Sequence, residues 1–365
     1  MNNDKPRKIP IIFYISAISS LAAFIILRAA RGSYSFADKV SGSVGAFLRR
    51  LFTYPTDLFS FSLFEAIICL IPVLLTLLIF FAVRAFKRRR KCRFLLTIVS
   101  IIGIIYTFYA LMMGASYHTT PLEDKLSLDA DAEITAAELD MTLDIIIPEL
   151  NALAEEVDFD GSTTVMPYSF DELGEKICEA YSTVSDTYGI VPKISTRAKP
   201  IYFSGVMSTF RITGIYTFYT GEANVNMAYP DYNLPFTVAH ELAHQRGIMR
   251  ENEANFVAFL VCISSTDPYI RYSGYLNMYE YLISALYKTD RELWQKQASR
   301  ITEQSIADIK ASNAVYEQYA DTVVGDISHN INNMYLQANG TQGTVSYGLV
   351  TRLAVAYYAQ ARLAQ

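Results

Sequence analysis

The residues best suited to chemistry lie in one short stretch, residues 236–247, which contains the sequence His-Glu-Leu-Ala-His. On a helix, His240 and His244 are one turn apart and share a face, so both imidazoles can bind one metal ion. Glu241 lies beside them, where it can act as the general base. The neighbouring residues are apolar, so the helix is expected to be buried, and a metal would satisfy its polar groups. We therefore predict one Zn²⁺ ion per chain.

A catalytic zinc site needs a third protein ligand. The metzincin pattern would place a histidine at position 250, but this chain has Arg250, which cannot bind the metal. The remaining candidates are Glu251 and Glu253. On a helix, Glu251 shares its face with small residues, which allow a close approach to the helix of His240, whereas Glu253 shares its face with bulky apolar residues. We favour Glu251 as the third ligand, with Glu253 as the alternative.

Three apolar runs in the first third of the chain are long enough to cross a bilayer as helices. They cover about residues 9–27, 58–83 and 94–113. Residues 84–93, between the last two runs, hold seven Lys or Arg in ten positions, and such loops stay in the cytoplasm. We therefore expect a multi-pass protein of the cell membrane, with a cytoplasmic N-terminus and an extracytoplasmic catalytic domain.

The charge of the chain divides at the same place. Residues 1–116 carry a net charge of +11 and residues 117–365 carry −16. The acidic part would repel phosphates, which argues against nucleic acid as a partner. We expect a membrane domain of residues 1–116 and an outer domain of residues 117–365. Glu65 inside the second apolar run, and Arg49 and Arg50 in the external loop, depart from this pattern.

The outer domain is predicted to be mostly helical with a small sheet. Capping sequences that start at Thr135 and Ser169 each open a helix, and helices resume at Pro235. Between them, β-branched and aromatic residues at 201–203 and 212–219 are typical of strands, and we interpret Gly205, Gly214 and Gly221 as breaks. Cys178 and Cys262 can form a disulfide, but their spacing gives this no support, and we favour two buried thiols.

The motif and the residues after it resemble gluzincin metallopeptidases. In several gluzincin families a ligand glutamate opens a helix, with Ala three and Asp or Asn four residues later. The same pattern occurs at Glu251, Ala254 and Asn255. The resemblance therefore implies that Glu251 is the third ligand and that Asn255 supports a metal-bound histidine. The gap between His244 and Glu251 is shorter than in most gluzincins.

The whole chain also resembles a family of bacterial membrane proteins known only as a domain of unknown function with this zinc signature. The resemblance includes the N-terminal spans, residues 219–226 before the motif, and residues 339–340 and 346–348 near the C-terminus. It covers most of the chain, but it implies no particular substrate.

Zincins, which the motif resembles, normally align the substrate along an edge strand. The strand at residues 212–219, continued to 226, precedes the motif helix, and its backbone is expected to hold an extended peptide by strand addition. Glu222 and Asn224 are candidates for substrate contact, with a turn role as the alternative. An oxyanion-stabilising group is also needed, and the sequence leaves open Tyr275, Tyr279, Tyr335, Tyr347, Arg271 and His329.

These features predict a mainly α protein, in which three transmembrane helices precede an α+β zincin-like domain with a small sheet and many helices. The predicted function is that of a membrane-anchored zinc metallopeptidase acting on extracytoplasmic proteins or peptides, with zinc-bound water activated by Glu241. The alternative is a zinc-containing membrane sensor or receptor, or an inactive binding protein. The expected partners are the lipid bilayer and a protein or peptide substrate, and the oligomeric state stays open.

Overall fold

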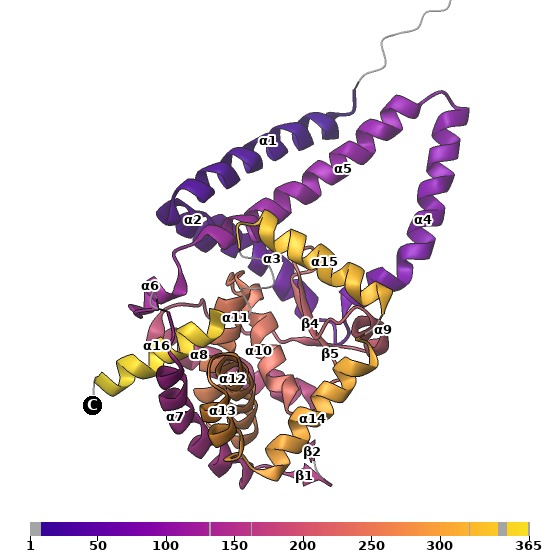
Figure 1. Ribbon diagram of the computed structural model, residues 1–365. Helices are drawn as coiled ribbons and strands as arrows, with labels where there is room; N and C mark the ends of the chain where they lie inside the picture. The colour runs from indigo at the N-terminus through magenta and orange to yellow at the C-terminus, as the bar shows by residue number, and fades with distance from the viewer. Residues whose placement is uncertain (1–8, 131–132, 162, 321, 342–348, 364–365) are drawn as a thin grey trace, which may run out of the picture.

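Three long apolar helices extend from a helical body in the computed structural model, which describes residues 9–130, 133–161, 163–320, 322–341 and 349–363 (Figure 1). They are α1 (Ile11–Gly32), α4 (Leu63–Lys87) and α5 (Lys91–Met112). Each is long and apolar enough to cross a membrane, and the third apolar segment continues to His118. The prediction of three span-length helices is therefore confirmed. The second begins at Leu63 rather than at residue 58, because the Ser62 side chain caps its first turn.

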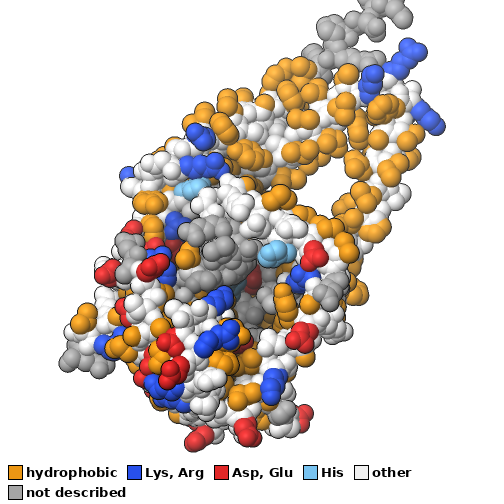
Figure 2. Space-filling model, in the orientation of Figure 1, with side chains coloured by type: hydrophobic (Ala, Val, Ile, Leu, Met, Phe, Trp, Pro, Cys, Tyr) orange, Lys and Arg blue, Asp and Glu red, His pale blue; other side chains and the backbone are white. Residues whose placement is uncertain are grey.

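Two of these helices, α1 and α5, pack side by side through small residues. Ser16 Oγ donates a hydrogen bond to the carbonyl of Ser100, and Ser20 Oγ donates one to that of Gly103, each at 2.9 Å. Gly103 has no side chain that would separate the helices. Helix α4 stands apart and meets α5 at the basic connection (Figure 1). Hydrophobic side chains cover all three helices, whereas acidic side chains gather on the body (Figure 2).

The segment between α1 and α4 is helical and lies against the body. It consists of α2 (Tyr34–Val40), a π-helical turn (Ser41–Gly45) and α3 (Ala46–Asp57). Arg49 of α3 is 2% exposed, and its guanidinium donates hydrogen bonds to the carbonyls of Met112 and Ser41. This arginine therefore lies within the protein, where it binds the carbonyl at the end of α5.

The body is mainly helical, as predicted. A 3₁₀ turn (Gly114–His118) joins α5 to it. Its helices are α6 (Leu122–Leu126), α7 (Ala136–Ala154), α8 (Phe170–Tyr188), α9 (Ser204–Thr209), α10 (Asn233–Gln245), α11 (Glu251–Ile263), α12 (Pro268–Thr289), α13 (Arg291–Ala298), α14 (Glu303–Gln318), α15 (Val323–Ala338) and α16 (Val350–Leu363). Thr135 and Ser169 cap α7 and α8, which confirms both predicted helix starts.

The strands are short and form two small sheets. β1 (Phe159–Asp160) pairs with β2 (Thr163–Thr164), and β3 (Lys199–Ile201), β5 (Glu222–Asn226) and β4 (Gly214–Thr217) form a second sheet in that order. β5 runs parallel to β3 and antiparallel to β4. The predicted continuous strand at 212–226 is therefore wrong, because Gly221, with φ of +72°, turns the chain back between β4 and β5.

The core of the body lies around α11, which is buried along most of its length. Helices α7, α8, α10, α12 and α16 supply most of the other buried apolar side chains of this core, and β5 adds Ala223 and Val225. The sequence of α11 is apolar on almost every side, which is typical of a helix enclosed by others. Helix α10 contacts both the three-stranded sheet and α11, so it holds its side chains between the two. Cys178 and Cys262 are free thiols, as we favoured, but only Cys262 is buried, whereas Cys178 is half-buried.

Candidate metal centre

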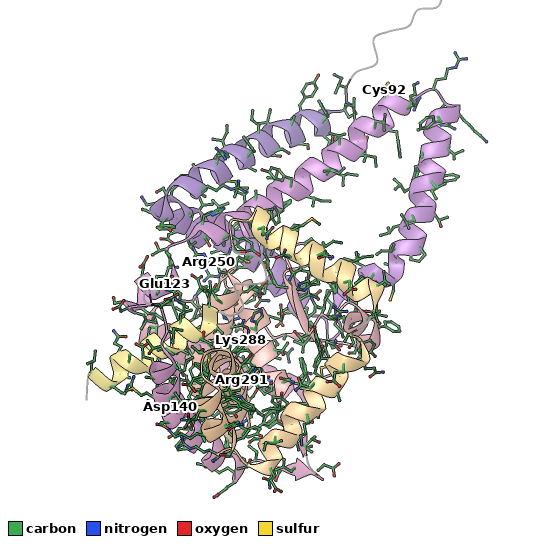
Figure 3. The ribbon with its side chains drawn as sticks, viewed as in Figure 1. Cys92, Glu123, Asp140, Arg250, Lys288 and Arg291 are labelled. Carbon is green, nitrogen blue, oxygen red and sulfur yellow. The ribbon has the colours of Figure 1, made fainter. Side chains whose placement is uncertain are left out.

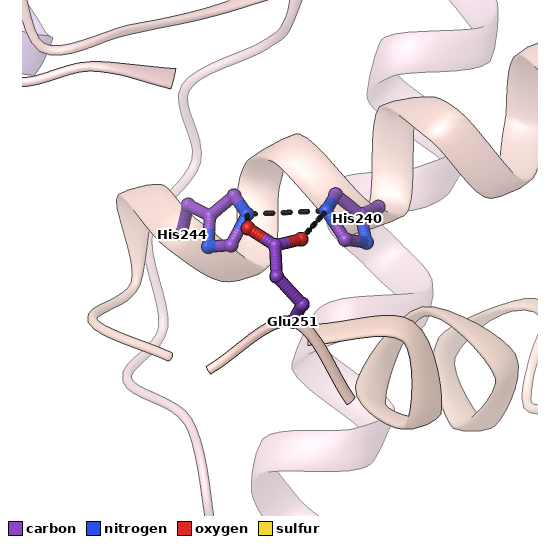
Figure 4. Close-up of side chains that lie close together, drawn as sticks. All are labelled: His240, His244 and Glu251. Carbon is purple, nitrogen blue, oxygen red and sulfur yellow. Dashed lines mark hydrogen bonds and ion pairs between the residues drawn. The ribbon is translucent and has the colours of Figure 1, made fainter. Parts of the chain in front are cut away.

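The two histidines of the motif lie on one face of α10, as the helical spacing predicts (Figure 4). Pro235 lies in the first turn of this helix, where its missing amide costs no hydrogen bond. After the helix, Gly247 adopts a φ of +100°. The amide of Ile248 bonds back to the carbonyl of Ala243 at 3.0 Å. This tight turn directs the chain into α11, whose first residue is Glu251.

The structure brings His240, His244 and Glu251 together, with one ligand atom from each lying within 4.8 Å of the others. The Nε2 atoms of the two histidines are 3.1 Å apart. Glu251 Oε2 lies 3.3 Å from Nε2 of His240, and Oε1 lies 3.8 Å from Nε2 of His244 (Figure 4). Ligand atoms bound about 2.0–2.1 Å from a tetrahedral zinc ion lie about 3.3 Å from one another. The three donors therefore fit one such ion.

His244 is held in the form that a metal ligand requires. Its Nδ1 lies 2.7 Å from the carbonyl oxygen of Ile248, which can only accept a hydrogen bond. Nδ1 therefore carries the proton and leaves the lone pair of Nε2 directed at the site. Burial lowers the pKa of His244 to about 4, which keeps the imidazole neutral.

His240 has carboxylates and an amide as neighbours. Burial lowers its pKa, but the hydrogen bond to Glu251, the charge of Glu241 and the side chain of Asn255 outweigh burial, so the pKa is raised. Asn255 lies one turn after Glu251 on α11 and is 3% exposed. The side chain of Asn255 is therefore close enough to His240 to raise the pKa of that imidazole.

Glu241 is buried next to the three converging donors, and its Oε2 has no hydrogen-bond partner within the part of the chain that the structure describes. Burial raises the pKa of this carboxyl to about 8, while the backbone amide of Tyr216 acts in the opposite direction. A cation held by the neighbouring histidines would favour the ionised form again. The protonation of this carboxyl would therefore depend on whether a cation is held beside it.

Strand β4 fixes the position of Glu241, a role that the sequence reasoning missed. A Cβ added at Gly214 would lie 2.5 Å from Glu241 Oε1, so only glycine allows this approach. β4 is at the edge of the sheet and pairs only with β5 among the described residues. A glycine within a strand signals such an approach of another group, but we interpreted Gly214 as a break.

Glu253 lies away from the two histidines. Its carboxylate accepts a hydrogen bond from the amide of Leu122 at 2.9 Å and forms an ion pair with Arg250. Arg250 also donates to the carbonyls of Tyr117 and Thr119. Figure 3 places Arg250 where the third membrane helix enters the body, far from Cys92 at the other end of that helix. The pair Arg250–Glu253 thus holds the connection from α5 beside the helix that carries Glu251.

The predicted substrate contacts Glu222 and Asn224 are engaged with the start of α4. Both oxygens of Glu222 accept hydrogen bonds from amides in the first turn of α4, at 3.0 and 2.9 Å. Asn224 Oδ1 accepts a hydrogen bond from Ser62 at 2.7 Å. In return, Glu65 of α4 accepts hydrogen bonds from the amides of Tyr202 and Phe203. These contacts attach β5 to α4 and give Glu65 a structural role that its sequence position did not indicate.

The structure separates the candidates for oxyanion stabilisation. Arg271 pairs with Glu149, His329 is exposed on α15, and Tyr275 and Tyr279 are buried along α12. Tyr335 packs with Tyr117, Tyr216 and Met249, next to β4 and the turn before Glu251. Tyr347 lies outside the described residues.

The sequence profile of a family described as Protein of unknown function (DUF3810) matches residues 41–355, so the chain belongs to this family. The match runs from the turn before α3 into the last helix and covers α4, α5 and the metal centre. Comparisons with curated proteins and with solved structures give no match.

Proposed function

We propose that the protein is a membrane-anchored zinc metallopeptidase of gluzincin type, which hydrolyses proteins or peptides outside the cytoplasm. The observation that carries this proposal is the convergence of His240, His244 and Glu251, with Glu241 buried beside them. Two imidazoles and a carboxylate are a common ligand set for catalytic zinc. Zinc bound there would lower the pKa of a bound water and polarise the scissile carbonyl.

The protein's own residues perform the proton transfer and the positioning. Glu241 takes the proton from the attacking water and delivers it to the leaving amine. Burial keeps His244 neutral, and the hydrogen bond from its Nδ1 to the carbonyl of Ile248 leaves the Nε2 lone pair available. The free edge of β4 offers backbone groups to an extended peptide, which would lie alongside Glu241.

The orientation of the chain follows from its basic residues. The cluster of Lys and Arg at residues 84–93 lies at the end of the α4–α5 hairpin that is farthest from the body (Figure 1). Clusters of this kind remain in the cytoplasm. The body and its metal centre are therefore proposed to lie outside the cytoplasm.

The test uses the full chain purified in detergent. We expect about one zinc per chain, to be lost in His240→Ala and Glu251→Ala and kept in Glu241→Gln. Glu253→Gln is the matched control, because this buried glutamate lies on the same helix turn and is expected to leave the zinc in place. Hydrolysis of a fluorogenic peptide mixture should disappear in Glu241→Gln. Full activity of that variant would contradict the mechanism.

A second function, a zinc-containing sensor or receptor, is favoured by the contacts that tie β5 to the start of α4. The same experiment separates the two functions. The sensor would be favoured if the wild-type chain retains zinc, hydrolyses no peptide in the mixture and captures a cytoplasmic partner.

A further inference from the structure

Helix α15 carries a stripe of apolar side chains that faces away from the body. The stripe consists of residues that are 38–74% exposed, namely Val323, Val324, Ile327, Ile331 and Met334. Their spacing of three or four residues places them on one side of the helix. The buried positions Gly325 and Leu336 fall on the opposite side. Among the described residues, the stripe therefore stays largely outside the packing of α15 onto the body.

Most polar residues of α15 lie along one flank, between the apolar stripe and the buried face. They include His329 and Asn330, which are both exposed. A helix with a protein-facing side, an apolar side and a polar flank suits a boundary between water and the apolar interior of a bilayer.

The position of α15 places it at the ends of the membrane helices. At its C-terminal end, Arg31 of α1 donates a hydrogen bond to the carbonyl of Ala338 at 3.0 Å, and Tyr109 of α5 donates one to Asn339 at 2.6 Å. At its N-terminal end, Asp326 pairs with Arg211, which follows α9. Helix α15 thus crosses from the ends of α1 and α5 towards the start of α4 (Figure 1).

Other exposed apolar side chains lie at the same level, around the start of α4. Leu58, Phe59 and Phe61 immediately precede this helix. Tyr202 and Phe203, which are 76% and 61% exposed, are held at its first turn because their amides bond to Glu65. Together with α15, these residues surround the ends of the three spans with apolar surface.

We propose that the body rests directly on the bilayer and that α15 lies in the membrane plane, with its apolar stripe among the lipid acyl chains. Helix α15 is bonded to the ends of two helices that are long and apolar enough to cross a membrane and crosses towards the start of the third (Figure 1), which identifies lipid as the occupant of its stripe. A cavity of about 390 Å³ between α15, α1 and α5 is lined by Phe24, Leu27, Arg28 and Arg31 among others. Apolar and basic side chains together suit the headgroup boundary.

This arrangement brings the metal centre near the membrane surface. Tyr335 and Leu336 of α15 pack against Tyr216 of β4 and Met249. A single helix would then separate the bilayer from the edge strand beside Glu241.

The test places a tryptophan on α15 of the full chain, in a Trp294→Phe background, because Trp294 is the only native tryptophan. Ile331→Trp lies on the stripe, and Asn330→Trp on the polar flank is the matched control. Both variants are reconstituted in phosphatidylcholine vesicles with and without acyl-brominated phosphatidylcholine, which quenches nearby tryptophan. We expect several-fold stronger quenching and a blue-shifted emission for Ile331→Trp.

Equal quenching of the two variants would overturn the proposal. A different outcome would assign the stripe to a second copy of the chain instead. In that case the emission of Ile331→Trp would be blue-shifted, brominated lipid would not quench it, and dilution in detergent would abolish the shift. The melting temperature of each variant must match that of the parent. If Ile331→Trp fails this control, Ile327→Trp on the same stripe replaces it. Stronger quenching than in Asn330→Trp would again support the proposal, and equal quenching would overturn it.

Discussion

Replacing Gly214 by alanine tests whether strand β4 sets the position of the proposed general base. The added Cβ would lie 2.5 Å from Glu241 Oε1, 2.6 Å from Cγ and 2.8 Å from Cδ. Since non-bonded atoms pack best at about 3.5–4.0 Å, the carboxylate must move by about 1 Å. Such a displacement of a catalytic group lowers the rate by about 100-fold. The metal ligands are untouched, so the zinc content should stay the same.

The assay measures peptide hydrolysis and zinc content in the same purified protein. Gly205→Ala is the control, because its added Cβ would meet no atom closer than Tyr319 Oη at 4.0 Å. We expect Gly214→Ala to keep its zinc and to lose activity, with a stability cost of about 1–3 kcal/mol from overpacking. Wild-type activity with zinc present would refute the role of β4. Loss of zinc together with activity would show a wider collapse of the site.

Three other substitutions test neighbouring parts of the structure. Glu222→Ala leaves two amides of α4 without acceptors and should lower stability by about 1–3 kcal/mol in thermal unfolding. Reduced hydrolysis at unchanged stability would instead support the predicted role of Glu222 in substrate contact. Asn255→Ala should weaken zinc binding about 10–100-fold by releasing His240, as measured by competition with a chelator. Burial raises the pKa of Glu280 to about 7, so the folded state holds a proton that the unfolded state loses above about pH 4.5. The contribution of Glu280 to stability is therefore fully present below pH 4.5 and is lost as the pH rises through 7, and Glu280→Gln should remove this part of the pH dependence in melting curves between pH 5 and 8. A slope unchanged by Glu280→Gln would contradict that assignment.

The sequence predicted those parts of the protein that depend on local spacing. The helical period placed His240 and His244 on one face, and the apolar runs located three span-length helices. Glu251 and Glu253 were separated by the size of their neighbours on the helix, which is also a local property. The structure brings Glu251 to the histidines and holds Glu253 against Arg250.

Contacts between distant segments could not be predicted in the same way. Glu222 binds amides about 160 residues earlier in the chain, and Arg49 binds the carbonyl of Met112. No periodicity or motif connects such residues, so Arg49 could only be interpreted by its charge. The hairpin of β4 and β5 was also missed, because aromatic residues continue past the end of β4 to Tyr219 and only Gly221 marks the reversal.

The attachment of β5 to α4 has an evolutionary consequence. The carboxylate of Glu222 accepts hydrogen bonds from amides in the first turn of α4, and the carboxylate of Glu65 accepts them from the amides of Tyr202 and Phe203. The N-terminal helices and the body therefore satisfy each other's hydrogen-bonding groups. A recombination event that replaced the N-terminal helices with another anchor would leave buried amides and carboxylates unpaired on both sides. The two parts should therefore be inherited together, and relatives that have the histidine motif but a different anchor should lack both glutamates.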